Sequence, residues 1–398
     1  MRVKAWLNLA AVILIVIIVI VVILVFRLYR PQADNLHDVF GLVTHIRELP
    51  QLEDWSGFRT YNPSIFTVGG PKSTANDCYY VYRVCNFALC PGTRNQWNAR
   101  HRERTVSHTV IQSPSGGLTI IKHPRLEQLF PDQREEEFHG RQNYDGRIGR
   151  RNCEQGGEDA RPFIIGQKLY LISNATTGYQ CRRQMILMQF NLNQLNSSAG
   201  TFDRLKDIEP QKIWQLEYDA GVHRDQKNWM PLNIHNELHF VYSVNPHVIL
   251  KFDKQSGRCH KIASTWNCNL SDELRGGSQI IRVTKWNLRS RSCLNTSPHY
   301  KAEELYLGVL HKRDSTFEYM TYIYAFETKH PYRVKYITDS FVFGEYGSHS
   351  RRIQFAAGLA RVVQNDRAYL YITYGENDCT SKVCVLLEED VLRSLNRV

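Results

Sequence analysis

From Phe58 onward the chain consists of short runs in which apolar and polar residues alternate, and Gly, Asn, Asp or Pro separates one run from the next. Alternation with a period of two is typical of strands that bury one face. A helical period is clearest in Glu388–Leu395, near the C-terminus. The pattern therefore predicts an all-β domain, which is a sandwich, a barrel or a propeller.

One strand pattern, Leu-aromatic-apolar, returns at nearly equal intervals. Its leucines, separated by 69, 67 and 65 residues, are Leu169, Leu238, Leu305 and Leu370. Cys78–Arg83 is a weaker copy, and the 341 residues of 58–398 hold about five such units. Coincidence among unrelated strands is the alternative, but near-equal spacing favours a repeat. Four antiparallel strands per unit, arranged radially, predict a five-bladed β-propeller.

The N-terminal part has a different character. Leu9–Phe26 is an unbroken apolar run of 18 residues, which extends to Ala5 if Asn8 is tolerated. A helix of about 20 such residues crosses the hydrocarbon layer, whereas a cleaved signal peptide has a shorter apolar stretch that ends at small residues. We therefore expect a cytoplasmic tail (1–4), a transmembrane signal anchor (5–26), a stem (27–57) and a propeller (58–398).

The flanking charges of the anchor are nearly balanced, so other features must set its orientation. Four glycosylation sequons lie downstream of it; they begin at Asn174, Asn196, Asn269 and Asn295. All ten cysteines lie beyond residue 77, and an even number behind an anchor indicates disulfides in an oxidising lumen. Cys379 and Cys384 are close enough in sequence for a small disulfide loop. These features predict a single-pass type II glycoprotein of the secretory pathway, in the Golgi, with a lumenal propeller.

Composition adds two restrictions. A hydrophobic share of 42% and a charged share of 22% exclude wholesale disorder, and 11% aromatic residues suit a protein that handles carbohydrate. The formal net charge of +11 favours anionic partners: nucleic acid, anionic lipids or phosphorylated small molecules. The lumenal address argues against nucleic acid.

Polar motifs precede the repeated strands, where a propeller would gather them near its axis. These motifs are Arg59–Ile65, Glu158–Phe163, Gln226–Pro231, Arg275–Gln279 and Phe355–Gly358. Any one of them is a turn by default. Their recurrence in phase predicts a funnel lined by Asp, Arg, Lys, Asn and Trp.

Three of these motifs resemble those of the β-mannoside phosphorylases and related β-mannosyltransferases, which are five-bladed propellers. The matching pieces are Tyr61-Asn62-Pro63, Glu158-Asp159-Ala160-Arg161 and Lys227-Asn228. The resemblance spans most of residues 58–380 as an order of short matches, with alanine at 160 where that family has proline. It implies that Asp159 is the general acid/base and that arginine, lysine and histidine hold phosphate. The strings Lys227–Pro231 and Tyr242–His247 also resemble those of membrane-anchored glycosyltransferases with this fold.

Asp159 is the predicted catalytic carboxylate. Inverting transfer from a nucleotide sugar needs one base to take the proton of the acceptor hydroxyl, whereas hydrolysis normally needs two carboxylates. Candidates for a second carboxylate are Asp225, Glu376 and Asp378, so hydrolysis stays open. The alternative for Asp159 is a turn residue paired with Arg161.

Basic and polar residues of the other motifs are predicted to bind substrate. Arg161, Lys227 and Arg275 would converge on phosphate, unless they are surface charge. Trp229 would stack on a sugar or a base, unless it is a buried aromatic. For each histidine, the alternative to ligand binding is a structural role. The remaining predicted contacts are Asn62, Asn228, Asn245, His247, Gln279, His311, Glu376 and Asp378.

The expected activity is glycosyl transfer, of mannose or a related hexose, from a nucleotide sugar to a glycan acceptor. No Asp-x-Asp or zinc spacing occurs, so we expect neither a metal nor another cofactor. The alternatives are a glycoside hydrolase or phosphorylase on the same fold, and a non-catalytic carbohydrate-binding propeller.

Overall fold

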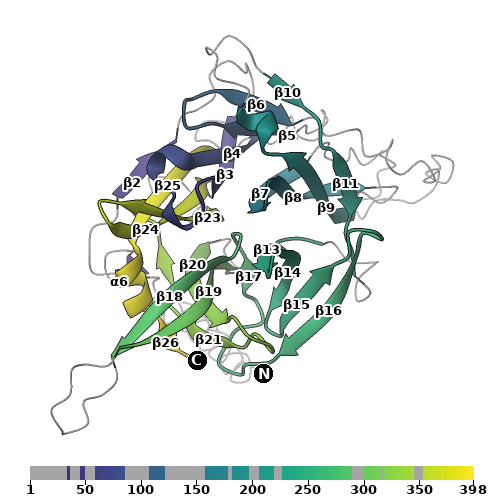
Figure 1. Cartoon of the computed structure of the whole chain (residues 1–398). Coiled ribbons are helices and arrows are strands. Elements are labelled where there is room, and N and C mark those ends of the chain that lie inside the picture. Colours follow the sequence, from purple (N-terminus) through teal and green to yellow (C-terminus); the bar gives the residue numbers. More distant parts are fainter. Residues whose placement is uncertain are drawn as a thin grey trace, which may run out of the picture. The chain divides into compact units, whose positions relative to one another are not determined.

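The computed structural model describes residues 34–35, 45–49, 59–85, 107–121, 157–177, 182–196, 206–218, 226–288, 300–314, 318–344 and 353–398. The sheets belong to a unit that spans Asn35–Val398. Within the described ranges the strands form five β-sheets, and the innermost strand of each sheet faces a common centre (Figure 1). The predicted all-β, propeller-like fold is therefore confirmed.

Each sheet is named here by a strand at its inner side. The β3 sheet comprises β3 (Arg59–Thr67), β4 (Cys78–Cys85), β5 (Ser107–Gln112), β6 (Leu118–Ile121) and β10 (Lys206–Ile208). The β7 sheet comprises β7 (Gly157–Ile165), β8 (Lys168–Thr177), β9 (Arg182–Asn191) and β11 (Lys212–Gln215). The β13 sheet comprises β13 (Met230–Ile234), β14 (Glu237–Val244), β15 (His247–Phe252), β16 (Arg258–Thr265) and β12 (Glu217–Tyr218).

The last two sheets contain the strands that follow residue 274, together with β1 and β2 from the N-terminal part. The β18 sheet includes β17 (Arg275–Gly276), β18 (Ile281–Leu288), β19 (Tyr300–Arg313), β20 (Tyr319–Glu327), β21 (Val334–Ile337), β22 (Phe341–Val342), β26 (Asn396–Arg397) and β1 (Asp34–Asn35). The β23 sheet comprises β23 (Gln354–Gln364), β24 (Arg367–Glu376), β25 (Thr380–Leu387) and β2 (His45–Glu48). The short helices are η1 (Gly70–Lys72), η2 (Ala75–Asp77), α5 (Asn193–Asn196) and α6 (Glu388–Arg393).

The repeated strand pattern occurs once in each of the five sheets. The copies fall on β4, β8, β14, β19 and β24, each of which is second from the centre. The polar motifs before them belong to the innermost segments, which include β3, β7 and β23. The predicted helix near the C-terminus is α6.

Apolar side chains occupy both faces of these sheets, because each sheet packs between two neighbours. Phe163 and Tyr170 of the β7 sheet share one buried cluster with Trp229 and Phe240 of the β13 sheet. Strands buried on both faces read as nearly continuous apolar runs, as β8 and β14 do.

At the centre, Gln279 ties three sheets together. Its side-chain amide donates to the carbonyls of Ile65 and Leu359, and its Oε1 accepts from the Leu359 backbone N–H. Gly358 lies in the same region, where an added Cβ would come within 2.7 Å of the backbone nitrogen of Ile65. Gln279, predicted to bind substrate, therefore uses its side chain to hold inner strands together.

The N-terminal predictions fall largely outside the described residues. The tail 1–4 and the anchor 5–26 are not among them, and no described helix is long and apolar enough to cross a membrane. Within the predicted stem 27–57, β2 pairs antiparallel with β25, so the β23 sheet takes in residues ahead of position 58. Only one of the four β2 residues is apolar, so this segment shows no alternation of apolar and polar residues that would predict a strand.

The predicted Cys379–Cys384 disulfide is wrong. Cys384 is a free thiol, fully buried in the core, and its pKa is raised because burial disfavours the thiolate. Among the described cysteines, Cys78, Cys259 and Cys268 are free thiols as well. Small buried cysteines act here as core residues.

Of the sequons, Asn174 lies within β8 and is 2% exposed, so the folded chain has no room for a glycan there. Asn269 is exposed. Asn196 ends α5, and Asn295 lies outside the described residues. Glycosylation at these last three positions stays a prediction.

Candidate active site

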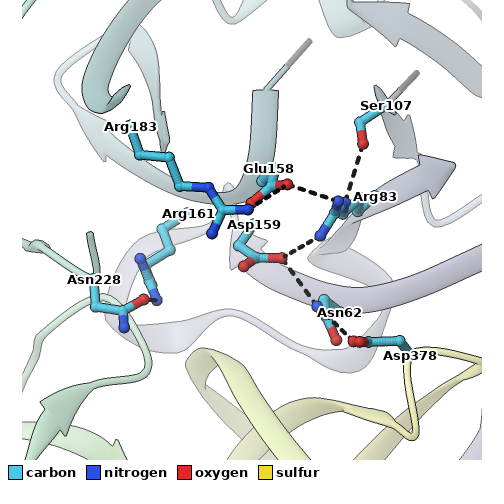
Figure 2. A network of polar contacts seen from close by, with 9 residues as sticks. All are labelled: Asn62, Arg83, Ser107, Glu158, Asp159, Arg161, Arg183, Asn228 and Asp378. Carbon is cyan, nitrogen blue, oxygen red and sulfur yellow. Dashed lines mark hydrogen bonds and ion pairs between the residues drawn. The ribbon is translucent and has the colours of Figure 1, made fainter. Parts of the chain in front are cut away.

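Three polar residues near the centre share an unusual backbone conformation. Asn62, Asp159 and Asn228 have φ values of 48°, 51° and 61°. Asn and Asp are the non-glycine residues that best tolerate this left-handed region. In β3 and β7 the strand register shifts at Asn62 and Asp159, respectively. Such bulges re-aim side chains, and here they turn both residues into one network (Figure 2).

The centre of that network is the Asn62 amide, which joins two carboxylates. Its Nδ2 donates to Asp159 Oδ1 at 3.0 Å and to Asp378 Oδ1 at 3.4 Å. The two oxygens are thus separated by no more than the sum of these distances, about 6.4 Å. Paired carboxylates that act on a glycosidic bond lie about 5–9.5 Å apart. Asp378 belongs to the turn between β24 and β25, so three sheets contribute to the contact.

Two arginines and Glu158 support Asp159 from behind. Arg83 Nη2 lies 2.9 Å from Glu158 Oε1, and its Nη1 lies 3.7 Å from Asp159 Oδ1. Arg183 approaches the same Glu158 oxygen at 3.5 Å, and Ser107 accepts a hydrogen bond from Arg83. Burial by itself would lower the pKa of Arg83, but Glu158, with smaller effects from other neighbours, raises it well above the usual value. Arg83 therefore stays cationic and holds Asp159 Oδ1 in place.

Asp159 keeps one oxygen for chemistry. Its side chain is 15% exposed, and the contacts with Asn62 and Arg83 both use Oδ1. Among the described residues, no hydrogen bond or ion pair involves Oδ2. A carboxyl group with one oxygen fixed and the other open is suited to proton transfer.

Arg161 is a buried cation without a carboxylate partner among the described residues. It is 1% exposed, and it donates to the carbonyls of Gly277 and Gly276 and to Asn228 Oδ1. Burial lowers its pKa to about 10, against a raising effect of Asp159. It is thus charged at neutral pH, and a buried uncompensated charge favours an anionic ligand.

His311 lies in the same cationic surroundings. Burial lowers its pKa to about 3, and the charges of Arg161, Arg275 and Arg313 add to this effect. The ring packs on Phe355 and is neutral at physiological pH, and its Nδ1 has no hydrogen-bond partner among the residues that the structure describes. A neutral imidazole among arginines offers a donor or an acceptor without adding charge.

The structure brings together five of the predicted residues in the contacts of Figure 2, namely Asn62, Asp159, Arg161, Asn228 and Asp378. His311 lies close enough to Arg161 for the charge of Arg161 to help lower the pKa of His311. Glu376 Oε2 instead lies 2.6 Å from Lys382 Nζ, and the charge of the lysine offsets that of the carboxylate. Asp225 lies outside the described residues.

Other predicted residues serve structure or face solvent. Trp229 is 1% exposed and donates to Gln226, as the buried-aromatic alternative required. Lys227 is exposed, and Arg275 is exposed with its guanidinium on the carbonyls of Asp272 and Leu274. Asn245 and His247 contact the connections after β16 and β20, away from the network around Asp159.

Sequence reasoning missed Arg83, Glu158, Arg183 and Tyr319. Glu158 stood in the quoted motif without a role, and Arg83 ended the weaker repeat copy. Burial is the main cause of the raised pKa of Tyr319. Arg313 lowers this pKa, whereas the nearby charges of Asp378 and Asp159 raise it further. The sequence signal that could have identified the Arg83–Glu158 pair is their opposite charge, because the two residues belong to neighbouring repeat units.

Two buried histidines, His247 and His311, predict a loss of stability in acid. Burial lowers the pKa of His247 to about 4 and that of His311 to about 3, while an unfolded histidine titrates near about 6.5. Below about pH 6.5 the unfolded chain binds more protons, so the free energy of unfolding should fall by up to about 1.4 kcal/mol per pH unit for each histidine.

This slope can be measured by denaturant unfolding between pH 7 and 5. His311→Gln should reduce this slope by the contribution of one histidine, because glutamine does not titrate. The exposed His260 is the matched control, and His260→Gln should leave the slope unchanged. A slope unaffected by His311→Gln would contradict the neutral, buried state of this ring.

Neither a known family profile nor a curated protein sequence matches the chain. Among solved structures it is similar to a β-1,2-mannobiose phosphorylase from Listeria innocua, with 13% identity, 91% of this chain and 98% of that chain covered, and a TM-score of 0.48. It is also similar to a mannose phosphorylase from Leishmania mexicana, in complex with phosphate (12% identity, 88% and 92% covered, TM-score 0.39). A xylan β-1,4-xylosidase from Bacillus halodurans is a third (11% identity, 85% and 54% covered, TM-score 0.38).

The predicted nucleotide-sugar glycosyltransferase is wrong. The three solved structures named above are two phosphorylases and a xylosidase, which correspond to the alternative stated with that prediction. Transfer was favoured by the predicted Golgi anchor, which lies outside the described residues, and by the nucleotide sugars of that lumen. Lys227 is exposed and takes no part in the network around Asp159.

Proposed function

We propose that the protein is a glycoside phosphorylase, with Asp159 as the acid and phosphate bound at Arg161 as the nucleophile. The supporting observation is the pairing of two features at one centre. Asp159 has one oxygen fixed by Asn62 and Arg83, and Arg161 is a buried cation without a carboxylate partner among the described residues. No resident cofactor is needed for this reaction.

In the proposed reaction, a phosphate oxygen attacks the anomeric carbon as the glycosidic C–O bond breaks. The Asp159 carboxyl gives its proton to the leaving oxygen, so the products are a sugar 1-phosphate and a glycan shortened by one unit. Asp159 then regains a proton from solvent or the next dihydrogen phosphate. Arg161 and the other arginines near His311 would stabilise the anionic nucleophile.

Hydrolysis is the second candidate, because Asp378 supplies another carboxylate beside Asp159. In that case Asp378 would activate water in place of phosphate. The same amide of Asn62 would hold both carboxylates, and the two reactions would differ in the nucleophile, phosphate or water.

We further infer that each of the five sheets is one blade, so that substrate would approach along the axis of a five-bladed propeller. The spacing of the repeated strands and the position of each copy second from the centre support this count. The anchor at 5–26 and the Golgi address stay predictions of the same proposal.

The assay that separates the reactions incubates the purified chain with β-mannobiose and longer β-mannosides, with and without inorganic phosphate. The resemblance of the motifs makes these sugars the first choice. We expect mannose 1-phosphate to form only when phosphate is present. Free mannose at the same rate with or without phosphate would identify a hydrolase, and neither product from any β-mannoside would contradict the proposal for this substrate class.

A further inference from the structure

The turn that follows β16 places a glycosylation sequon beside an exposed tryptophan. The sequon is Asn269-Leu270-Ser271, and Trp266 stands three positions before its asparagine. Trp266 is 65% exposed, and among the described residues Val68 is the only other large hydrophobic side chain that is exposed. A single exposed apolar side chain is common on protein surfaces. The position of this one next to a sequon gives it a specific candidate partner.

Hydrogen bonds fix the shape of this turn. The Leu270 backbone N–H donates to the Asn267 carbonyl at 3.1 Å, which closes a β-turn over residues 267–270. The Asn269 backbone N–H donates to Asn267 Oδ1 at 3.0 Å. Asn245, which follows β14, donates its side-chain amide to the carbonyls of Asn267 and Leu270. The turn is therefore held in one shape while the side chain of Asn269 is exposed.

The side-chain amide nitrogen of Asn269 is available for modification. In the described part of the chain this side chain has one polar contact, in which the Cys268 thiol lies 3.8 Å from its Oδ1. Its Nδ2, the atom to which a glycan is joined, has no hydrogen bond there. Asn174, by contrast, is 2% exposed within β8. Of these two sequons, the folded chain can therefore carry a glycan at Asn269.

A sugar on Asn269 can reach the indole of Trp266. Consecutive Cα atoms are about 3.8 Å apart, so the Cα atoms of these two residues lie within about 11 Å of each other. The turn that begins at Asn267 brings them closer than an extended chain would. A tryptophan side chain and an asparagine-linked sugar together span this gap. Among the described residues, the indole makes no hydrogen bond or ring contact that would hold it elsewhere.

We propose that Asn269 is N-glycosylated and that its first N-acetylglucosamine packs on the indole of Trp266. In the modification, Asn269 Nδ2 bonds to C1 of the sugar, the bond from C1 to the diphosphate of a polyprenyl-linked oligosaccharide breaks, and one amide proton is lost to solvent. The C–H face of the sugar then lies on the negative face of the ring. The sequon selects this ligand, because it attaches that sugar beside Trp266. The proposal rests on the predicted lumenal address and is independent of the reaction at Asp159.

The experiment is hydroxyl-radical footprinting of the full chain, made in animal cells that keep their N-glycans in the high-mannose form. Peptide mapping should find a glycan on Asn269. One sample is trimmed with an endoglycosidase that leaves a single N-acetylglucosamine, and another is stripped with the amidase that removes the whole glycan. Oxidation of Trp266, read by mass spectrometry, should be equal in the untreated and trimmed samples. It should rise about twofold in the stripped sample, because a packed sugar covers one of the two faces of the ring.

Asn269→Gln gives the same comparison without an enzyme, and the enzymatic comparison in turn does not depend on the folding of a variant. This substitution removes the sequon at an exposed position and should raise the oxidation of Trp266 by the same factor. Trp214, a half-buried residue of β11 whose indole donates to the Lys254 carbonyl, should be oxidised equally in the two proteins. An Asn269 without a glycan, or a Trp266 that is oxidised equally in the trimmed and stripped samples, would overturn the proposal.

Discussion

Asp159→Asn is expected to abolish turnover while the protein stays folded. Asparagine keeps the size of the side chain, tolerates the left-handed backbone at this position, and cannot give the proton that the leaving oxygen needs. Loss of a general acid typically costs about 10²–10⁴-fold in rate. The measurement is kcat for sugar 1-phosphate release, together with the melting temperature.

Asp366→Asn is the matched control for this substitution. Asp366 also has a positive φ, of 58°, but it lies exposed in the turn between β23 and β24. It should change the free energy of unfolding by less than about 0.5 kcal/mol and leave kcat unchanged. If Asp159→Asn retains full activity, or loses it only through unfolding, Asp159 is a structural turn residue.

Asp378→Asn tells phosphorolysis and hydrolysis apart in the same assay. A phosphorylase would keep part of its kcat, since phosphate needs no base to attack, whereas a hydrolase would lose the group that activates water.

The repeat and its motifs were predictable from sequence because they depend on local pattern. A strand of one type every 65–69 residues placed β8, β14, β19 and β24, and polar residues before those strands marked the centre. Asn62 and Asp159 were identified from sequence because each belongs to one of the short polar motifs that precede the repeated strands.

The roles that sequence could not assign depend on contacts between sheets. Whether Trp229 faces a ligand or the core is decided by Phe163 and Tyr170 of the β7 sheet, which lie across a sheet boundary that no local pattern describes. Gln279 likewise looked like a ligand contact until its partners, Ile65 and Leu359, were found on two other sheets. Asp159 and Asp378 are 219 residues apart in sequence, and only closure of the ring of sheets brings both to Asn62.

Arg161→Met is expected to weaken phosphate binding strongly. Methionine keeps an unbranched side chain but removes the charge, and a hydrogen bond to a charged group is worth about 1.5–3 kcal/mol. The KM for phosphate should therefore rise about 10–100-fold. The free energy of unfolding should also fall by about 1–3 kcal/mol, because Gly276 and Gly277 lose a donor in a buried place.

Two further variants separate the charge of Arg161 from its structural bonds. Arg161→Lys keeps the cation but not the planar fork, so it should recover part of the phosphate affinity and little of the stability. Lys261→Met removes an equal charge from an exposed position on β16 and should change neither quantity. If Arg161→Met lowers stability but leaves the KM for phosphate unchanged, the buried cation holds the inner strands together and phosphate binds elsewhere.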